Sequence, residues 1–295
     1  MKLVLTFLSL LIPFGFTNHV LADVVVFNTR IDGAIGGFSF TAGDFVRYDL
    51  ETDEASIFFS GSNFSVVNDN EINPDALSVR DDGSFLFSVR RGTELAGLTI
   101  NSIRLVDYDA VSGVATTAFN GAGGFDIAGV DILDNGNYLL AAKVNNTSLG
   151  GHVYSIGDIV EYNPITNEAS TFFSADNFLT EAEGGPAAPA NIDAVDLYDG
   201  SLLFSTSNTA AIRTPLGGSL LVRQENVYAF DLATGETSLF FDGTNIFTSN
   251  SIDLKSFSVL SADFRLTPVP EPSSSVVALL GVLVFGFRRN RKLSA

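Results

Sequence analysis

The chain has no cysteine, no tryptophan, one methionine and only two histidines. Without cysteine, neither a disulfide nor a thiolate metal site can form. This absence does not indicate a cytoplasmic protein, because a chain of 295 residues can bury enough surface to fold without cross-links. Phenylalanine occurs 26 times and the hydrophobic fraction is 46%, so we expect phenylalanine to fill the core of one large or two modest domains.

Positive charge is also scarce. Residues 23–269 contain 11 basic and 33 acidic side chains, a net charge of −22. A field of this sign opposes nucleic acid and anionic lipid surfaces, whereas it permits cations, basic partners or neutral glycans. The same charge keeps an exported protein soluble. No glycine-rich phosphate loop joins a strand to a helix, so nucleotide binding is not expected.

The N-terminus has the features of a secretory signal peptide over residues 1–22. A single positive residue, Lys2, precedes an apolar stretch that ends at Phe16. Val20, Leu21 and Ala22 then place small or β-branched residues where a signal peptidase reads the chain. The sequence therefore predicts cleavage between Ala22 and Asp23, and the alternative is a retained N-terminal helix.

Two segment types alternate along the chain. The first type occurs four times, at 43–59, 101–119, 157–173 and 225–241, as in GDFVRYDLETDEASIFF and GDIVEYNPITNEASTFF. The second type lies between them, at 74–89, 127–142 and 192–206. Side chains alternate between apolar and polar with period two, which is typical of half-buried strands. Each segment is therefore a predicted hairpin.

The predicted turns have a mechanism. In the first segment type, Asp or Asn opens the turn by side-chain capping. The position that needs a positive φ is then occupied by Asp53, Gly113, Asn167 or Gly235. The second type turns at DDG, DNG or YDG, with glycine at the corresponding position.

Each repeat offers four short strands, so residues 23–266 resemble the blades of a β-propeller in architecture. We expect an all-β ring of four four-stranded repeats; the alternatives are a five-bladed ring with one degenerate blade, or an open β-sandwich. Residues 23–30 resemble a second strand of a unit and residues 251–260 a first strand. Their pairing would close the ring without free edges. No WD or kelch signature is present, so the architecture implies no function.

Two acidic clusters place oxygen ligands at alternating positions, as calcium loops do. In the first, residues 49–54, Asp49 and Asp53 are best explained as turn residues, because the other repeats have plain turns there. In the second, residues 68–75, calcium remains an option, and its candidate ligands are Asp69, Glu71 and Asp75. The spaced glycine of an EF-hand loop is missing.

Catalysis has little support in the sequence. His152, the one histidine outside the signal peptide, lies in a glycine- and serine-rich segment predicted to be a loop, and no GxSxG motif accompanies it. Paired carboxylates for glycan hydrolysis remain open, since their separation depends on the fold. No catalytic or cofactor-binding residue is predicted. Inserts at 92–100, 180–191 and 209–224 are expected to be loops that recognise a ligand or are simply tolerated.

The C-terminus combines prolines, an apolar run and a basic cluster. Residues 273–287 would span about 22 Å as a helix, which is short of the roughly 20 residues that a bilayer requires. Such a segment suits a temporary stop better than a permanent anchor. We divide the region into a linker (267–275), a hydrophobic helix (276–287) and a basic cytoplasmic tail (288–295).

This tail resembles the PEP-CTERM sorting signal. Pro270, Glu271 and Pro272 match the recognition motif, and the basic residues that hold the C-terminus in the cytoplasm are Arg288, Arg289, Arg291 and Lys292. The resemblance implies export in a Gram-negative bacterium that makes exopolysaccharide, and recognition and processing by an exosortase. It implies a protein that is anchored in the inner membrane, transiently or permanently, and otherwise periplasmic, cell-surface or extracellular.

The function expected from these features is that of a surface- or matrix-associated binding or structural protein, with a glycan or cell-surface protein as ligand. The alternatives are a polysaccharide-active hydrolase or lyase that uses paired carboxylates, and a calcium-dependent adhesion module.

Overall fold

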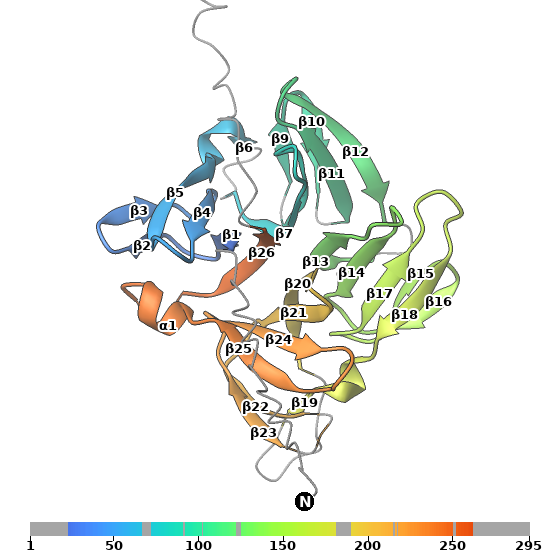
Figure 1. Ribbon diagram of the computed structural model, residues 1–295. Helices are drawn as coiled ribbons and strands as arrows, with labels where there is room; N and C mark the ends of the chain where they lie inside the picture. Colours follow the sequence, from blue (N-terminus) through green and yellow to red (C-terminus); the bar gives the residue numbers. More distant parts are fainter. Residues whose placement is uncertain are drawn as a thin grey trace, which may run out of the picture.

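The computed structural model describes residues 23–66, 72–90, 92–101, 103–121, 125–180, 190–214, 216, 218–249 and 252–261. Four antiparallel four-stranded sheets, which we call blades 1 to 4, surround a common axis (Figure 1). Helical structure in the described part consists of α1 (Gly243–Ile246) and short 3-10 turns such as Gly61–Asn63 and Ala175–Asn177. The predicted all-β ring of four repeats is confirmed.

From the axis outward, the four blades have the following strands. Blade 1 contains β26 (Leu254–Leu260), β1 (Val24–Thr29), β4 (Phe45–Asp49) and β5 (Glu54–Phe59). Blade 2 contains β7 (Pro74–Val79), β8 (Phe85–Val89), β11 (Arg104–Asp109) and β12 (Val114–Asn120). Blade 3 contains β13 (Ile127–Ile132), β14 (Tyr138–Ala142), β17 (Ile159–Tyr162) and β18 (Ala169–Phe173). Blade 4 contains β20 (Ile192–Tyr198), β21 (Ser201–Thr206), β24 (Val227–Asp231) and β25 (Thr237–Phe241).

Blade 1 closes the ring. Its innermost strand, β26, is the last strand among the described residues and pairs antiparallel with β1, the first of them, with Val25 opposite Val259 and Phe27 opposite Phe257. The expected pairing of segments 251–260 and 23–30 is therefore observed. This pairing gives blade 1 its fourth strand, so all four blades are four-stranded sheets of the same order.

The ring has two different faces. The innermost strands β7, β13, β20 and β26 lie beside one another around the axis and run in the same direction (Figure 1). Since neighbouring strands within a blade are antiparallel, all connections from the first strand to the second and from the third to the fourth lie on one face. We call this the turn face. The remaining connections lie on the opposite face, which we call the hairpin face.

The turn face has the tight turns that the sequence predicts. Asp53, Gly113, Asn167 and Gly235 have φ values of 56°, 70°, 59° and 76°. The Asp49 Oδ1 atom accepts hydrogen bonds from the backbone N–H groups of Glu51 and Thr52, at 3.1 and 3.2 Å. Asp49 and Asp53 are thus turn residues.

The hairpin face carries one additional hairpin per blade, between the second and third strands. The first two are β2 (Gly33–Ile35) with β3 (Phe38–Phe40) and β9 (Thr93–Leu95) with β10 (Leu98–Ile100). The other two are β15 (Thr147–Leu149) with β16 (His152–Tyr154) and β22 (Ala210–Arg213) with β23 (Ser219–Val222). The expectation of loops at 92–100, at 209–224 and around His152 is therefore wrong. The first three hairpins have two-residue turns of the kind common in β-hairpins: Gly36–Gly37, Ala96–Gly97 and Gly150–Gly151.

The chain segments that link one blade to the next hold these hairpins in place. After blade 1, β6 (Ser65–Val66) pairs with β9 of blade 2, and after blade 3, β19 (Leu179–Thr180) pairs with β22 of blade 4. After blade 4, Phe247 forms a bridge with Ile35 of blade 1. Each of these contacts joins two consecutive blades. Most of the predicted insert 180–191 lies outside the described residues.

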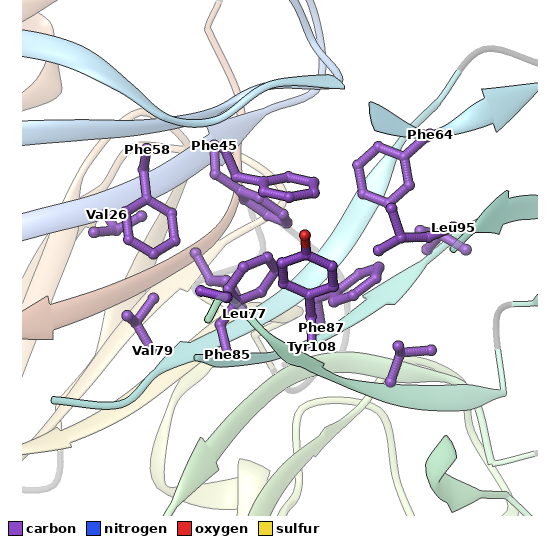
Figure 2. Packing of buried hydrophobic residues seen from close by; sticks show 14 of the residues in the cluster. Val26, Phe45, Phe58, Phe64, Leu77, Val79, Phe85, Phe87, Leu95 and Tyr108 are labelled. Carbon is purple, nitrogen blue, oxygen red and sulfur yellow. The ribbon is translucent and has the colours of Figure 1, made fainter. Parts of the chain in front are cut away.

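Phenylalanine fills the seams between blades, as its abundance predicts. Figure 2 shows the cluster between blades 1 and 2, where rings from both blades meet. The Phe85 ring centroid lies 5.6 Å from that of Phe45 and 5.1 Å from those of Phe59 and Tyr108. The contacts of Phe85 with Phe45 and Phe59 are edge-to-face, and an aromatic pair of this kind adds about 0.5–1.5 kcal/mol beyond the buried area. The seams therefore hold the ring together without cysteine or tryptophan.

Candidate functional site at the axis and on the hairpin face

Charged side chains approach the axis on the hairpin side, where the innermost strands begin. The pairing of each innermost strand with its neighbour skips one residue at the same position, which forms a β-bulge. The four bulged residues are Asp75, Ala128, Asp193 and Lys255. A bulge re-aims its side chain, and three of these four are charged.

These buried charges are paired. The Lys255 ammonium contacts the carboxylate of Asp193 and lies 3.2 Å from Asp253 Oδ2, while the Lys143 ammonium contacts Asp75. Asp75, Asp193 and Lys255 are exposed by 0%, 2% and 4%. Burial raises the pKa of Asp193 to about 6, against the opposing charge of Lys255. This network is a structural cross-link between blades 1 and 4 and between blades 2 and 3.

A ring of acceptor oxygens surrounds this network. One residue of each blade occupies the same position in the repeat. In each blade its backbone carbonyl accepts a hydrogen bond from the N–H group of the residue just after the second strand. The four residues are Asn73, Asp126, Asn191 and Asp253. Their Oδ1 atoms, and that of Asp75, are buried and have no hydrogen-bond partner within the described residues. The unpaired oxygens raise the energy of this end of the axis.

On the turn side of the axis, a second ring of side chains joins neighbouring blades. Asp131 Oδ2 accepts the N–H of Leu197 in blade 4 at 3.0 Å, and Asp196 accepts the N–H of Val259 in blade 1. Ser258 Oγ accepts the N–H of Val79 in blade 2 at 3.1 Å. The Ser78 hydroxyl completes the ring by donating to Asp131 Oδ1 at 3.1 Å.

The two carboxylates of this ring have raised pKa values. Burial raises the pKa of Asp131 to about 6, although the hydrogen bonds that its carboxylate accepts from backbone N–H groups lower this pKa. Burial also raises the pKa of Asp196, and the charge of Asp131 raises it further. Between the two rings, Gly129 lies so close to β20 that a Cβ atom would be 2.8 Å from Ala194 Cα. The innermost strands therefore pack directly against one another.

Two hollows open on the hairpin face of blade 1. One, of about 540 Å³, is bordered by Arg30, Ile31 and Asp32 and reaches Ile72 at the seam with blade 2. The other, of about 630 Å³, reaches Thr248 at the seam with blade 4. Asp32 and Thr41 line both hollows, so the two adjoin each other at the base of the β2–β3 hairpin, and we call them together the blade 1 groove.

The structure describes one of the three predicted calcium ligands. Asp75 lies in β7, buried against Lys143, rather than in a surface insertion, while Asp69 and Glu71 lie outside the described residues. Among the described residues, no three His, Cys, Asp or Glu side chains are close enough to hold a metal ion. Calcium binding by segment 68–75 stays a prediction.

His152 begins β16 and is exposed, and its ring lies 6.4 Å from that of Tyr154. Asp23, the predicted first residue after cleavage, is buried and accepts a hydrogen bond from the Tyr198 hydroxyl. Ala22 lies outside the described residues, as do the sorting residues Pro270, Glu271, Pro272, Arg288, Arg289, Arg291 and Lys292.

Sequence reasoning missed the axial charges and the blade 1 groove. A signal for the charges exists, since the apolar first strands contain isolated polar residues in register, as in PDALSV, IDAVDL and LKSFSV. The pairing of these residues depends on the ring, because Lys255 and Asp193 are 62 positions apart. The groove has no local sequence signal, since its residues come from three blade connections.

Comparison with solved structures gives weak overall similarity. A chain of a nidogen/laminin complex is 10% identical, with 82% of this chain and 99% of that chain covered and a TM-score of 0.38. A streptogramin B lyase is 11% identical, with coverages of 81% and 98% and a TM-score of 0.36. A virginiamycin B lyase from Staphylococcus aureus is 10% identical, with coverages of 76% and 71% and a TM-score of 0.31. These values carry no functional argument.

No curated protein matches the chain significantly. Within the described residues, no helix has the length and hydrophobicity needed to cross a membrane. Residues 268–292, by contrast, match the PEP-CTERM protein-sorting motif. The chain therefore carries the sorting signal that marks an exported protein for an exosortase, attached to a four-bladed β-propeller-like ring.

Proposed function

We propose that the protein is a binding or structural component of the cell surface or extracellular matrix and that it binds its ligand through the hairpin face. The observation that carries this proposal is the sorting motif at residues 268–292. Proteins with this signal are exported and held at the membrane before processing. A ligand outside the cell is therefore the expected target.

The positions of the two chain ends support the choice of face. Asp23 precedes β1, which starts on the turn face, and Leu260 ends β26, which finishes on that same face. The predicted signal peptide and the sorting motif are thus both connected to the ring through the turn face. The hairpin face, with its four hairpins and the blade 1 groove, is free to contact a ligand.

The buried pair of carboxylates at the axis, Asp131 and Asp196, does not support hydrolysis or lyase chemistry. The charge of Asp131 raises the pKa of Asp196, but both side chains are buried. Each accepts a hydrogen bond from a backbone N–H group of the next blade. A glycosidase needs two carboxyl groups that reach the scissile bond. Calcium-dependent adhesion through segment 68–75 remains an outcome of the binding test in the next subsection, where chelator is added.

The sorting role of Glu271 can be tested directly. In a host that has an exosortase, we expect Glu271→Ala to leave the protein unprocessed and in the membrane fraction, as seen by its mass and by cell fractionation. Glu236→Ala, an exposed acidic residue beyond β24, is the matched control and should be processed normally. Normal processing of the Glu271 variant would contradict the proposed role.

A further inference from the structure

The blade 1 groove contains a carboxylate whose charge the fold does not require. Asp32 Oδ1 accepts the backbone N–H of Ala42 at 3.0 Å. At the equivalent place in blade 3, the neutral side chain of Asn145 accepts the backbone N–H of Ile156 at 2.9 Å. An amide oxygen is therefore sufficient for this loop bond, and the negative charge of Asp32 is available for another purpose.

Arg30 supplies the complementary donors at the same end of the groove. Its side chain is 52% exposed, and its one ion pair within the described residues is a long contact of 3.7 Å to Asp253. Asp253 is buried, and the contact involves a single nitrogen of the guanidinium group. A guanidinium group has five N–H donors, so most of them are free to bind a ligand.

The remaining lining adds apolar surface at both ends of this charged pair. Ile31 and Ile57, which line the two halves of the groove, are exposed by 43% and 41%. The groove thus combines a carboxylate acceptor, a guanidinium donor and aliphatic patches within hollows of a size typical of ligand sites.

We infer from this arrangement, and from the proposed function, that the blade 1 groove binds a neutral polyhydroxyl ligand, a short stretch of uncharged saccharide. Adjacent sugar hydroxyls can donate to Asp32 and accept from Arg30 at the same time, while the C–H face of the ring packs on isoleucine. The lining holds one cation, Arg30, and two carboxylates, Asp32 and Asp44, of which Asp44 is buried and accepts hydrogen bonds from Thr41 and Gly61. The groove therefore has no excess of positive charge for an anionic ligand.

Charge elsewhere on the ring supports the same choice. The net charge of −22 over residues 23–269 repels anionic polymers. Cationic ligands are attracted instead to the turn face, where carboxylates such as those of Asp49, Asp53 and Asp109 outnumber the basic side chains among the described residues. A neutral saccharide is attracted to no charged region of the surface, so its binding depends on the contacts that the groove provides.

The test measures binding by the exported protein, purified from the expressing host, to neutral tetrasaccharides of β-1,4-glucose, α-1,4-glucose and β-1,4-N-acetylglucosamine. Isothermal titration is done with and without a calcium chelator. We expect at least one saccharide to bind, and Asp32→Asn and Arg30→Gln each to weaken binding at least tenfold. Asp32→Asn should keep the wild-type melting temperature, because Asn145 already makes the same loop bond. Asp176→Asn, an exposed acid on the hairpin side of blade 3, should bind normally.

Several outcomes overturn the inference. The first is that no neutral tetrasaccharide binds, and the second is that the Asp32→Asn variant binds with the wild-type affinity. The third is that the chelator abolishes binding while both groove variants, without chelator, bind normally. A preference for polygalacturonate or for a chitosan oligomer would overturn it too. The proposed function fails separately, if the wild-type protein is absent from the cell surface and the extracellular fraction.

Discussion

Individual buried charges show how the axis balances burial against pairing. Lys255 is 4% exposed and neutralises Asp193 and Asp253, which are 2% and 4% exposed. Removing one partner of a buried pair is far more costly than removing a surface pair, since the other charge stays buried. Lys255 is therefore the most sensitive charged residue of this end of the axis.

Replacing Lys255 with Met tests this role. We expect the free energy of unfolding to fall by about 3–5 kcal/mol at pH 7.5, measured by urea denaturation, because Asp193 loses its cation and Asp253 keeps only the long contact with Arg30. Arg47→Met is the control, since its pair with Asp49 is near the surface and is worth at most about 1 kcal/mol. Equal losses in the two variants would show that Lys255 has no special role.

Buried carboxylates also set the pH dependence of stability. Asp131 has a pKa of about 6 in the folded protein, against about 3.9 when unfolded. The folded state therefore binds more protons between these values, so stability must fall as pH rises from about 4 to 6. Asp196, whose pKa burial also raises, acts in the same direction.

We expect the urea midpoint to be higher at pH 5 than at pH 7.5. Asp131→Asn should be less stable overall, because its NH2 group must face the N–H of either Leu197 or Ile132, and it should have a smaller pH slope. The difference between the urea midpoints at pH 5 and pH 7.5 is the informative quantity. A variant with only a weakened contact between blades would lower the midpoint equally at the two pH values. A wild-type protein that is more stable at pH 7.5 would contradict the assignment.

At the scale of elements, the repeated turns show what sequence can predict. A positive φ is recognisable locally, because glycine, asparagine and aspartate recur at one position of each repeat. The four strands of each blade and the closing pair were predictable for the same reason. The hairpin-face hairpins were missed since their strands have three or four residues, too few for a clear period. Their Gly-Gly and Ala-Gly turns were the available signal.

Exchanges between repeats can test the turn assignment. Gly235 has a φ of 76°, and an added Cβ would come no closer than 3.7 Å to the Leu216 side chain. Gly235→Val should lower the free energy of unfolding by about 1–2 kcal/mol through backbone strain alone. Gly235→Asn, which copies Asn167, should lose less. Equal stability of both variants in urea would indicate that this turn can change conformation.

At the scale of the whole molecule, the ring is closed at two levels. Near the axis, β26 pairs with β1 and contacts both neighbouring inner strands, β7 and β20. Farther out, Phe247 bridges to Ile35 and the Thr248 N–H donates to the Ala34 carbonyl at 3.1 Å. Both contacts join blade 4 or the chain end to blade 1. The axial charge pairs could not be predicted, because they exist only in the closed ring.

Deleting residues 251–260 tests whether the inner closure controls the fold. Without β26, blade 1 loses its innermost strand, the seams to blades 2 and 4 open, and Asp193 loses Lys255. We expect global unfolding, seen as loss of hydrogen-exchange protection in β7, β13 and β20 together. Deleting residues 148–153 of the β15–β16 hairpin is the control and should leave these strands protected, because this hairpin lies outside the four-stranded blades. If deletion of β26 exposed only β1, β4 and β5, the blades would be independent units and closure would be a local feature.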